Sequence, residues 1–340
     1  MSKIFIIGGP GNISRGTIDY LQERSYDIAI FTRSSDSKRR SRSTVTFYEG
    51  ERKDKDALKK AFDDFGAELV VDTICFELED AKTLYGLLRG NIRQLLFIST
   101  VDTYGYPLSR LPFGEQDKFS PTYGTYAAKK RQIELFYLDR YMKESFPVTI
   151  GRPSLSIGPK FCPMMFRDWG FTAVPRMKAE LPLLVPGDGN GLMHVGWGYD
   201  VGRMVGRMIG DAKAIGRDYT LSDENFLTRD AYISLFTTVL GVNPERVYIP
   251  QAFIESFRDE DQKPGILHLY RHNMAFSLDR FKRDFPDYQW LPLLHGVEEF
   301  IETNERNRSF PPASAEIMDD RIIQEWKRRL EGWITSSNNG

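Results

Sequence analysis

Short apolar runs alternate with longer polar or amphipathic segments over the first half of the chain. The apolar runs cover residues 4–7, 28–32, 45–48, 69–73 and 95–99, and a further run begins at residue 148. The intervening segments, such as 15–23 and 54–65, have the spacing of helices. This alternation is typical of parallel strands connected by helices that cover both faces of a sheet. The sequence therefore predicts an α/β fold with a doubly wound parallel sheet.

The pattern changes after Pro159. Proline, glycine and aromatic residues crowd 158–198, residues 219–222 resemble a further strand, and the chain from residue 228 is mixed and mainly helical. We predict that residues 1–158 and 193–222 form the sheet domain, and that 159–192 and 223–334 form a smaller, mostly helical substrate-binding lobe. Residues 335–340 are expected to be a disordered tail. In 317–334 the apolar residues are spaced as on a helix that packs on the lobe, and they are Ile322, Ile323, Trp326, Leu330 and Trp333.

Composition narrows the function classes. The 340 residues include 46 basic and 47 acidic side chains, for a net charge of -1, which gives no general electrostatic reason to bind nucleic acid or an anionic membrane. No apolar run approaches the roughly 20 residues that a membrane-spanning helix needs. A strand that begins almost at the N-terminus leaves no room for a signal peptide. Cys75 and Cys162 form no pattern, so we expect a cytoplasmic protein. His268 and His272 lack a third ligand, and no metal site is predicted.

A glycine-rich turn follows the first apolar run. It reads Gly8-Gly9-Pro10-Gly11-Asn12-Ile13-Ser14 and lies between a predicted strand and a predicted helix. Glycines in this context let the backbone approach a pyrophosphate, and the helix N-terminus supplies donors. Ser14 stands where a third glycine would fit more closely. The turn predicts a Rossmann-type dinucleotide-binding domain.

The second strand ends at Arg33, where an acidic residue would bind the ribose hydroxyls of NAD. Arginine suits a 2′-phosphate instead, so NADP is favoured over NAD. The alternative is a solvated basic loop, since several basic residues follow Arg33. Glu51, after the third strand, is expected to contact the adenine. The nearby basic residues are Lys38, Arg39, Arg40 and Arg42.

Tyr126 and Lys130 are four residues apart in a predicted helix and follow Thr100, which ends a predicted strand. Positions i and i+4 share one face of a helix. An ammonium beside a phenol lowers the pKa of the phenol from about 10 toward working pH. This spacing predicts a tyrosine that exchanges a proton with an alcohol while hydride leaves the alcohol carbon.

With these motifs in order, the chain resembles the extended short-chain dehydrogenase/reductase family, which includes nucleotide-sugar epimerases and dehydratases. The resemblance runs from Lys3 to about Pro159, and more loosely to about Phe300. It implies that Thr100 binds the reacting oxygen, that Tyr126 is the general base, and that Lys130 binds the nicotinamide ribose. It further implies an epimerase that removes and returns hydride through a 4-keto sugar, and a homodimer.

Asp102 and the region before His194 leave alternatives open. Dehydratases of the family tend to carry a glutamate base at the position of Asp102, whereas Asp102 follows Val101 and also suits a hydrogen-bonded loop. Asn190 stands where the family usually has a diphosphate-binding arginine, and Arg167 or Arg176 could replace that charge. A reductase or dehydratase of a sugar or natural product is therefore the alternative enzyme. Residues 31–33 and 50–54 also resemble a branch with chloroplast RNA-binding proteins, so a non-catalytic dinucleotide- or RNA-binding protein is the third reading.

Overall fold

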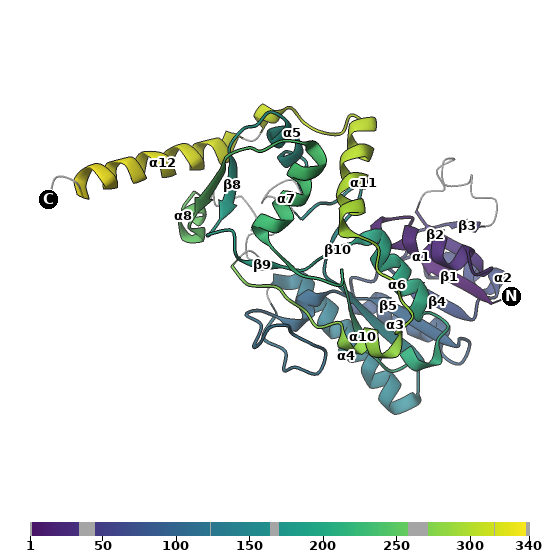
Figure 1. Cartoon of the computed structure of the whole chain (residues 1–340). Helices are drawn as coiled ribbons and strands as arrows, with labels where there is room; N and C mark the ends of the chain where they lie inside the picture. The colour runs from purple at the N-terminus through teal and green to yellow at the C-terminus, as the bar shows by residue number, and fades with distance from the viewer. Residues whose placement is uncertain are drawn as a thin grey trace. The chain divides into compact units, whose positions relative to one another are not determined.

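The structure, a computed structural model, describes residues 2–33, 45–122, 124–163, 170–257, 271–315 and 317–337. The chain forms two compact units. Unit 1 comprises Met1–Ser156, Gly196–Glu224 and Phe276–Pro292, and unit 2 comprises Ile157–Val195, Asn225–Ala275 and Leu293–Gly340. Figure 1 labels their helices and strands. Lys38, Arg39, Arg40, Arg42, Arg167 and His268 lie outside the described residues.

Unit 1 is built on a seven-stranded sheet in the order β11-β6-β5-β4-β1-β2-β3. Every neighbouring pair is parallel, which confirms the predicted doubly wound Rossmann-type α/β fold. The strand order reverses between β1 and β4, and ligands of such sheets bind outside the carboxyl ends of the strands at this point. The strands are β1 (Lys3–Ile7), β2 (Asp27–Thr32), β3 (Val45–Glu49), β4 (Leu69–Asp72), β5 (Gln94–Ile98), β6 (Val148–Pro153) and β11 (Asp218–Leu221).

Helices cover both faces of this sheet because its strands are apolar on both sides. In β1, Ile4 and Ile6 belong to the core beneath α1 and α6, whereas Phe5 and Ile7 belong to the core beneath α2, α3 and α4. The elements are α1 (Asn12–Gln22), α2 (Lys55–Phe65), α3 (Leu78–Leu88), η1 (Val101–Tyr104), α4 (Gly124–Glu144), α6 (Gly198–Met208), η2 (Ala212–Ala214) and α10 (Asp279–Asp284).

Residues 276–292 correct the predicted domain boundary. The sequence pattern predicts that they lie in the smaller lobe, but they belong to unit 1. Phe281 of α10 and Phe285, the residue that follows this helix, are buried in the core that contains α6 and Tyr219 of β11. Their ring centroids lie 6.3 and 5.7 Å from that of Tyr219. Aromatic packing therefore holds this segment against the sheet of unit 1.

Unit 2 is mostly helical with two small sheets. β8 pairs with β13 in parallel and β9 pairs with β12 antiparallel. Its elements are α5 (Ala173–Lys178), β8 (Leu183–Pro186), β9 (Leu192–Met193), β12 (Leu227–Thr228), α7 (Arg229–Leu240), β13 (Arg246–Ile249), α8 (Gln251–Glu255), α11 (Leu293–Arg306), η3 (Ala313–Ala315) and α12 (Ile317–Ser337). Two further strands, β7 (Leu155–Ile157) and β10 (Val195–Trp197), stand where the chain passes from one unit to the other.

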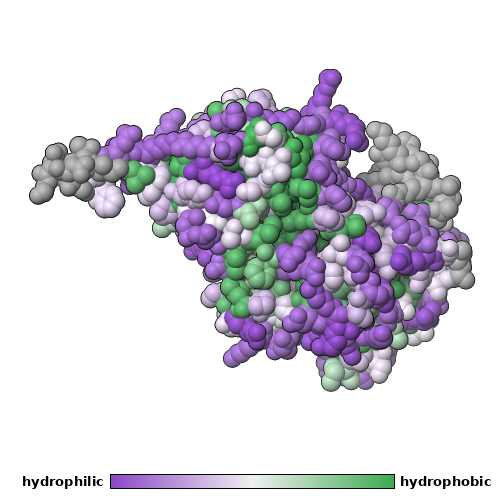
Figure 2. Space-filling view, viewed as in Figure 1, coloured by the Kyte–Doolittle hydropathy of each residue, from purple (hydrophilic) through white to green (hydrophobic). Residues whose placement is uncertain are grey.

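The first half of helix α12 packs in unit 2. Ile322 and Ile323 are buried and Trp326 packs against them, but Trp333 is 70% exposed. Figure 2 shows mainly hydrophilic residues over the coloured part of this helix. The expected apolar face is therefore wrong at Trp333. The helix continues to Ser337, so residues 335–337 are not a tail, and 338–340 lie outside the described residues.

Candidate active site

The glycine turn joins β1 to α1 at the point where the strand order reverses. Gly8 and Gly9 have φ of 93° and 110°, a region that favours glycine. A Cβ on Gly8 would lie 2.5 Å from Thr73 Oγ1, and one on Gly9 would lie 2.5 Å from Ser14 Oγ. Ser14 Oγ accepts a hydrogen bond of 2.6 Å from the Gly11 amide. The serine therefore braces the turn rather than loosening it.

The turn lines a cavity of about 630 Å³. The remaining walls come from the end of β2, the β3–α2 loop and the β4–α3 loop, so the structure brings Gly8, Gly9, Pro10 and Gly11 together with Arg33 and Glu51. Asn12 and Ile13 form the first turn of α1, next to this wall. The space and the glycine backbone fit a dinucleotide, as the sequence predicted. The other lining residues are Phe31, Thr32, Gly50, Arg52, Lys53, Ile74, Phe76, Glu77 and Asp80.

Arg52 is a cavity residue that no sequence pattern indicated. Its Nη2 donates to the Asp72 carboxylate at 2.8 Å and to the Asp80 carbonyl at 3.3 Å. Burial raises the pKa of Asp72 while Arg52 opposes that shift. Arg52 Nε is buried without a hydrogen-bond partner among the described residues, a state that buried polar atoms rarely adopt unless a ligand or water completes them. Nothing in the sequence distinguishes Arg52 from its neighbour Lys53, which is exposed.

Thr100, Asp102 and Tyr126 lie together beyond the carboxyl end of β5. Thr100 Oγ1 accepts a hydrogen bond of 3.2 Å from the Asp102 amide, and Asp102 Oδ1 accepts one of 3.2 Å from the Tyr106 hydroxyl. Tyr126 is in the first turn of α4 and is 47% exposed. Burial of its hydroxyl end and the charge of Asp102 raise the pKa of Tyr126 to about 12, while a hydrogen bond with Thr100 lowers it.

The spacing predicts that the Lys130 ammonium lowers the pKa of Tyr126. In the structure, burial and Asp102 raise that pKa, and the role of Lys130 toward Tyr126 stays a prediction. Lys130 Nζ donates to the Ile98 carbonyl at 2.8 Å and lies 4.7 and 4.9 Å from the ring centroids of Phe76 and Phe97. Only 1% of the residue is exposed, and burial lowers the pKa of Lys130 to about 8. Phe76, another residue missed from the sequence, covers the lysine, and its ring centroid lies 6.4 Å from that of Tyr126.

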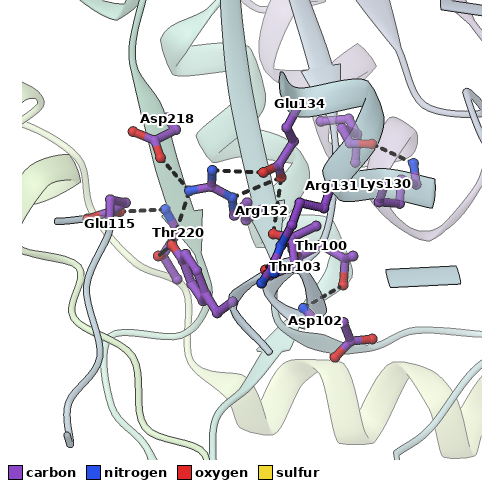
Figure 3. A network of polar contacts seen from close by, with 12 residues as sticks. Thr100, Asp102, Thr103, Glu115, Lys130, Arg131, Glu134, Arg152, Asp218 and Thr220 are labelled. Carbon is purple, nitrogen blue, oxygen red and sulfur yellow. Dashed lines mark hydrogen bonds and ion pairs between the residues drawn. The ribbon is translucent and has the colours of Figure 1, made fainter. Parts of the chain in front are cut away.

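A buried polar network connects α4 to β6 and to η1 (Figure 3). Arg152 of β6 donates from Nε and Nη2 to the two carboxylate oxygens of Glu134, both at 2.9 Å. Asp218 of β11 also pairs with Arg152. Thr103 Oγ1 contacts both the Thr100 carbonyl, at 2.9 Å, and Glu134 Oε1, at 3.2 Å. The network thus joins the elements that carry Thr100 and Tyr126.

Of the two arginines expected to replace the missing diphosphate-binding charge, Arg167 lies outside the described residues and Arg176 has partners of its own. Arg176 is fully buried, pairs with Asp320 at 2.7 Å and donates to the Pro182 carbonyl. The Asn190 amide nitrogen contacts Asp188 of the same loop at 3.3 Å. Arg176 is therefore a packing residue of unit 2. In the described part of the chain, no group of three or more His, Cys, Asp or Glu residues could hold a metal ion.

Comparisons with known proteins agree with this fold and site. The NAD dependent epimerase/dehydratase family matches residues 4–83 and 78–222, so the chain belongs to this enzyme family. A chloroplast stem-loop binding protein of 41 kDa from Arabidopsis thaliana is 24% identical over 266 residues, which cover 74% of this chain and 67% of that protein.

Solved structures share the fold. The dTDP-glucose 4,6-dehydratase of Bacillus anthracis, solved with NAD, has a TM-score of 0.70 and 19% identity, over 91% of this chain and 98% of that chain. The UDP-glucose 4-epimerase of Thermotoga maritima, solved with UDP-glucose, has a TM-score of 0.67 and 17% identity, over 90% of this chain and 99% of that chain. Among the described residues, no helix is long and apolar enough to cross a membrane.

Proposed function

We propose that this protein is an NAD(P)-dependent epimerase of a nucleotide-linked sugar. The observation that carries the proposal is the meeting of Thr100 and Tyr126 at the carboxyl edge of the sheet, in the same unit as the glycine-lined cavity. When bound, the oxidised nicotinamide supplies a hydride acceptor and a positive charge. A positive charge favours the ionised phenol and so offsets the effect of burial on Tyr126.

The side chains then have distinct roles in the proposal. Tyr126 takes the proton of the sugar hydroxyl while its carbon loses hydride, and Tyr126 returns the proton when hydride is added to the other face of the ketone. Thr100 holds the reacting oxygen. Lys130 uses one of its three N–H donors on Ile98, which leaves donors for the hydroxyls of the nicotinamide ribose. Leu135 and Met142, 61% and 80% exposed on α4, support the predicted homodimer.

Replacing Tyr126 with phenylalanine tests the assignment directly. We expect turnover of UDP- or dTDP-glucose to fall by about 10²- to 10⁴-fold, because general acid/base work is lost. Dinucleotide affinity, measured by calorimetry, is expected to stay the same because the glycine turn is untouched. Wild-type turnover in Tyr126→Phe would show that another group moves the proton.

Asp102 distinguishes epimerisation from dehydration, the alternative enzyme reaction. Hydride return at one carbon exchanges no carbon-bound proton with solvent, whereas dehydration needs a base beside the ketone. Asp102 already accepts a hydrogen bond from Tyr106 and follows a valine rather than a second acid. We therefore expect no deuterium on product carbon after reaction in D₂O. Deuterium in the wild-type product that is absent with Asp102→Asn would favour the dehydratase.

Arg33 supports NADP as the preferred cofactor. It lines the cavity at the end of β2 and is exposed there, where a 2′-phosphate can form a charge-assisted pair worth about 1.5–3 kcal/mol. We expect wild-type protein to bind NADP more tightly than NAD, and Arg33→Ala to lose that preference while NAD affinity holds. Equal affinities for NADP and NAD in both proteins would mean that Arg33 is a solvated surface residue and does not select the cofactor.

A non-catalytic protein that binds RNA or a dinucleotide is the second candidate, favoured by the similarity to the stem-loop binding protein. The net charge of -1 gives no general attraction to RNA. Retention of RNA rather than a dinucleotide by purified protein, identified by mass spectrometry, would replace the epimerase with this candidate.

A further inference from the structure

Thr103 lies between η1 and α4, the two elements of the proposed active site. It lies in η1, three residues after Thr100, and is fully buried. Its hydroxyl lies 2.9 Å from the Thr100 carbonyl oxygen and 3.2 Å from Glu134 Oε1. One small group therefore connects the loop that holds Thr100 to the helix that holds Tyr126 and Lys130.

The partners of Thr103 are themselves fixed. Glu134 is held by two hydrogen bonds from Arg152, whose side chain is buried on β6. Arg131 of α4 donates to the Thr103 carbonyl and to the Ser120 carbonyl. Helix α4 and η1 are thus connected twice (Figure 3). One connection runs from the Thr103 hydroxyl to Glu134, which Arg152 of β6 holds. The other runs from the Thr103 carbonyl to Arg131, which also contacts the Ser120 carbonyl.

Helix geometry transmits this connection to the catalytic face. Lys130 and Glu134 are one turn apart, and Tyr126 is one turn before Lys130, so all three share a face. A shift of Glu134 relative to η1 would move Tyr126 relative to Thr100 by a similar amount. A misplacement of about 1 Å in reacting groups can cost on the order of 10²-fold in rate.

We propose that Thr103 is a positioning residue that sets the separation of Thr100 and Tyr126 through its hydroxyl. The role rests on the proposed function, because it acts on the same proton transfer. Thr103 touches neither substrate nor cofactor in this proposal. Its effect is expected on the chemical step and on the surroundings of the Tyr126 hydroxyl, and not on dinucleotide affinity.

The test compares Thr103→Val, which removes the hydroxyl, with Thr103→Ser, which keeps it. We expect Thr103→Val to lower kcat by about 10- to 100-fold with KM and dinucleotide affinity unchanged, and Thr103→Ser to restore kcat. Thr149→Val is the matched control, because Thr149 is a fully buried threonine of β6 whose hydroxyl bonds to Gln94 and Ala214. Its kcat should remain that of the wild type despite a similar loss of stability.

A second measurement needs no turnover. In protein labelled with 3-fluorotyrosine, the Tyr126 fluorine resonance, assigned with Tyr126→Phe, should shift in Thr103→Val and return in Thr103→Ser. An unchanged resonance, or a kcat loss no larger than in Thr149→Val, would overturn the positioning role. If no sugar nucleotide is turned over by wild-type protein, the proposed function fails, while the fluorine resonance still decides whether Thr103 positions Tyr126.

Discussion

Two buried cations of unit 1 differ in the partners that surround them. Arg152 is enclosed by the carboxylates of Glu134 and Asp218, and its guanidinium lies over the Tyr104 ring at 4.9 Å. Lys130, one helical turn before Glu134, has the Ile98 carbonyl and two phenyl rings. Each residue is only 1% exposed. Comparing Arg152 with Lys130 therefore separates the effect of burial on the pKa of a cation from the effect of a nearby opposite charge.

The pKa shifts of the two cations have opposite directions. Burial alone would lower both, but Glu134, Tyr104 and Asp218 raise the pKa of Arg152 well above its ordinary value. Lys130 has more distant acidic groups, so burial prevails and lowers its pKa to about 8. Arg152 stays charged, as an arginine does at working pH, and its carboxylate partners stabilise that charge. Lys130, whose hydrogen-bond partner is a carbonyl, can lose its proton near working pH, as functional lysines do.

Breaking the Arg152 network is expected to have the largest effect. Glu134→Leu roughly keeps the volume of the side chain but leaves the buried Arg152 guanidinium without its bidentate carboxylate partner. Removing one member of a buried ion pair costs about 3–5 kcal/mol. We expect the free energy of unfolding, measured by urea titration, to fall by that amount.

The exposed pair of Lys59 and Asp63 on α2 provides the control. Asp63→Ala removes one partner of an ion pair that water already solvates, and we expect it to cost less than about 1 kcal/mol. If Glu134→Leu were as mild as Asp63→Ala, Asp218 alone would be sufficient for Arg152, and the contrast with Lys130 would lose its basis.

The sequence predicted the loops that line the cavity better than it predicted the surroundings of Lys130. The glycine turn, Arg33 and Glu51 follow successive strands, and parallel strands bring their carboxyl ends to one edge, so local pattern was sufficient. The surroundings of Lys130 depend on Phe76 and Ile98, which come from other strand ends. Helical spacing places Tyr126 and Lys130 on one face but cannot show which neighbour takes the ammonium.

The packing of residues 276–292 in unit 1 could not be predicted from the sequence, for a related reason. The aromatic residues Phe281, Phe285 and Tyr288 could pack in either unit, and only contact with Tyr219 decides between them. Arg52 was missed because a partly buried and an exposed basic residue are adjacent in the chain. The fold was predictable from periodicity, whereas these contacts depend on tertiary packing.

Removing the buried ammonium by Lys130→Met is expected to raise the free energy of unfolding, whereas Glu134→Leu lowers it. The native pKa of about 8 lies below the ordinary 10.5, so the unfolded chain binds more protons than the native protein between these values. The stability of the wild type therefore rises with pH across this window. Lys130→Met has no such group. Below about pH 8 the variant avoids the cost of burying an ammonium, on the order of 3 kcal/mol, and this advantage disappears by about pH 10.5.

The measurement is the difference in unfolding free energy between Lys130→Met and wild type, from urea titrations at several pH values from about 7 to 10. Lost contacts with Ile98 and the phenyl rings shift the difference by a constant, so its slope with pH is the quantity that reports the buried ammonium. Tyrosine ionisation affects both proteins and cancels. Lys59→Met is the matched control, since that ammonium is exposed on α2 and its difference should stay flat. A flat difference for Lys130→Met as well would mean that Lys130 keeps its ordinary pKa, and that both buried cations of unit 1 are fixed charges.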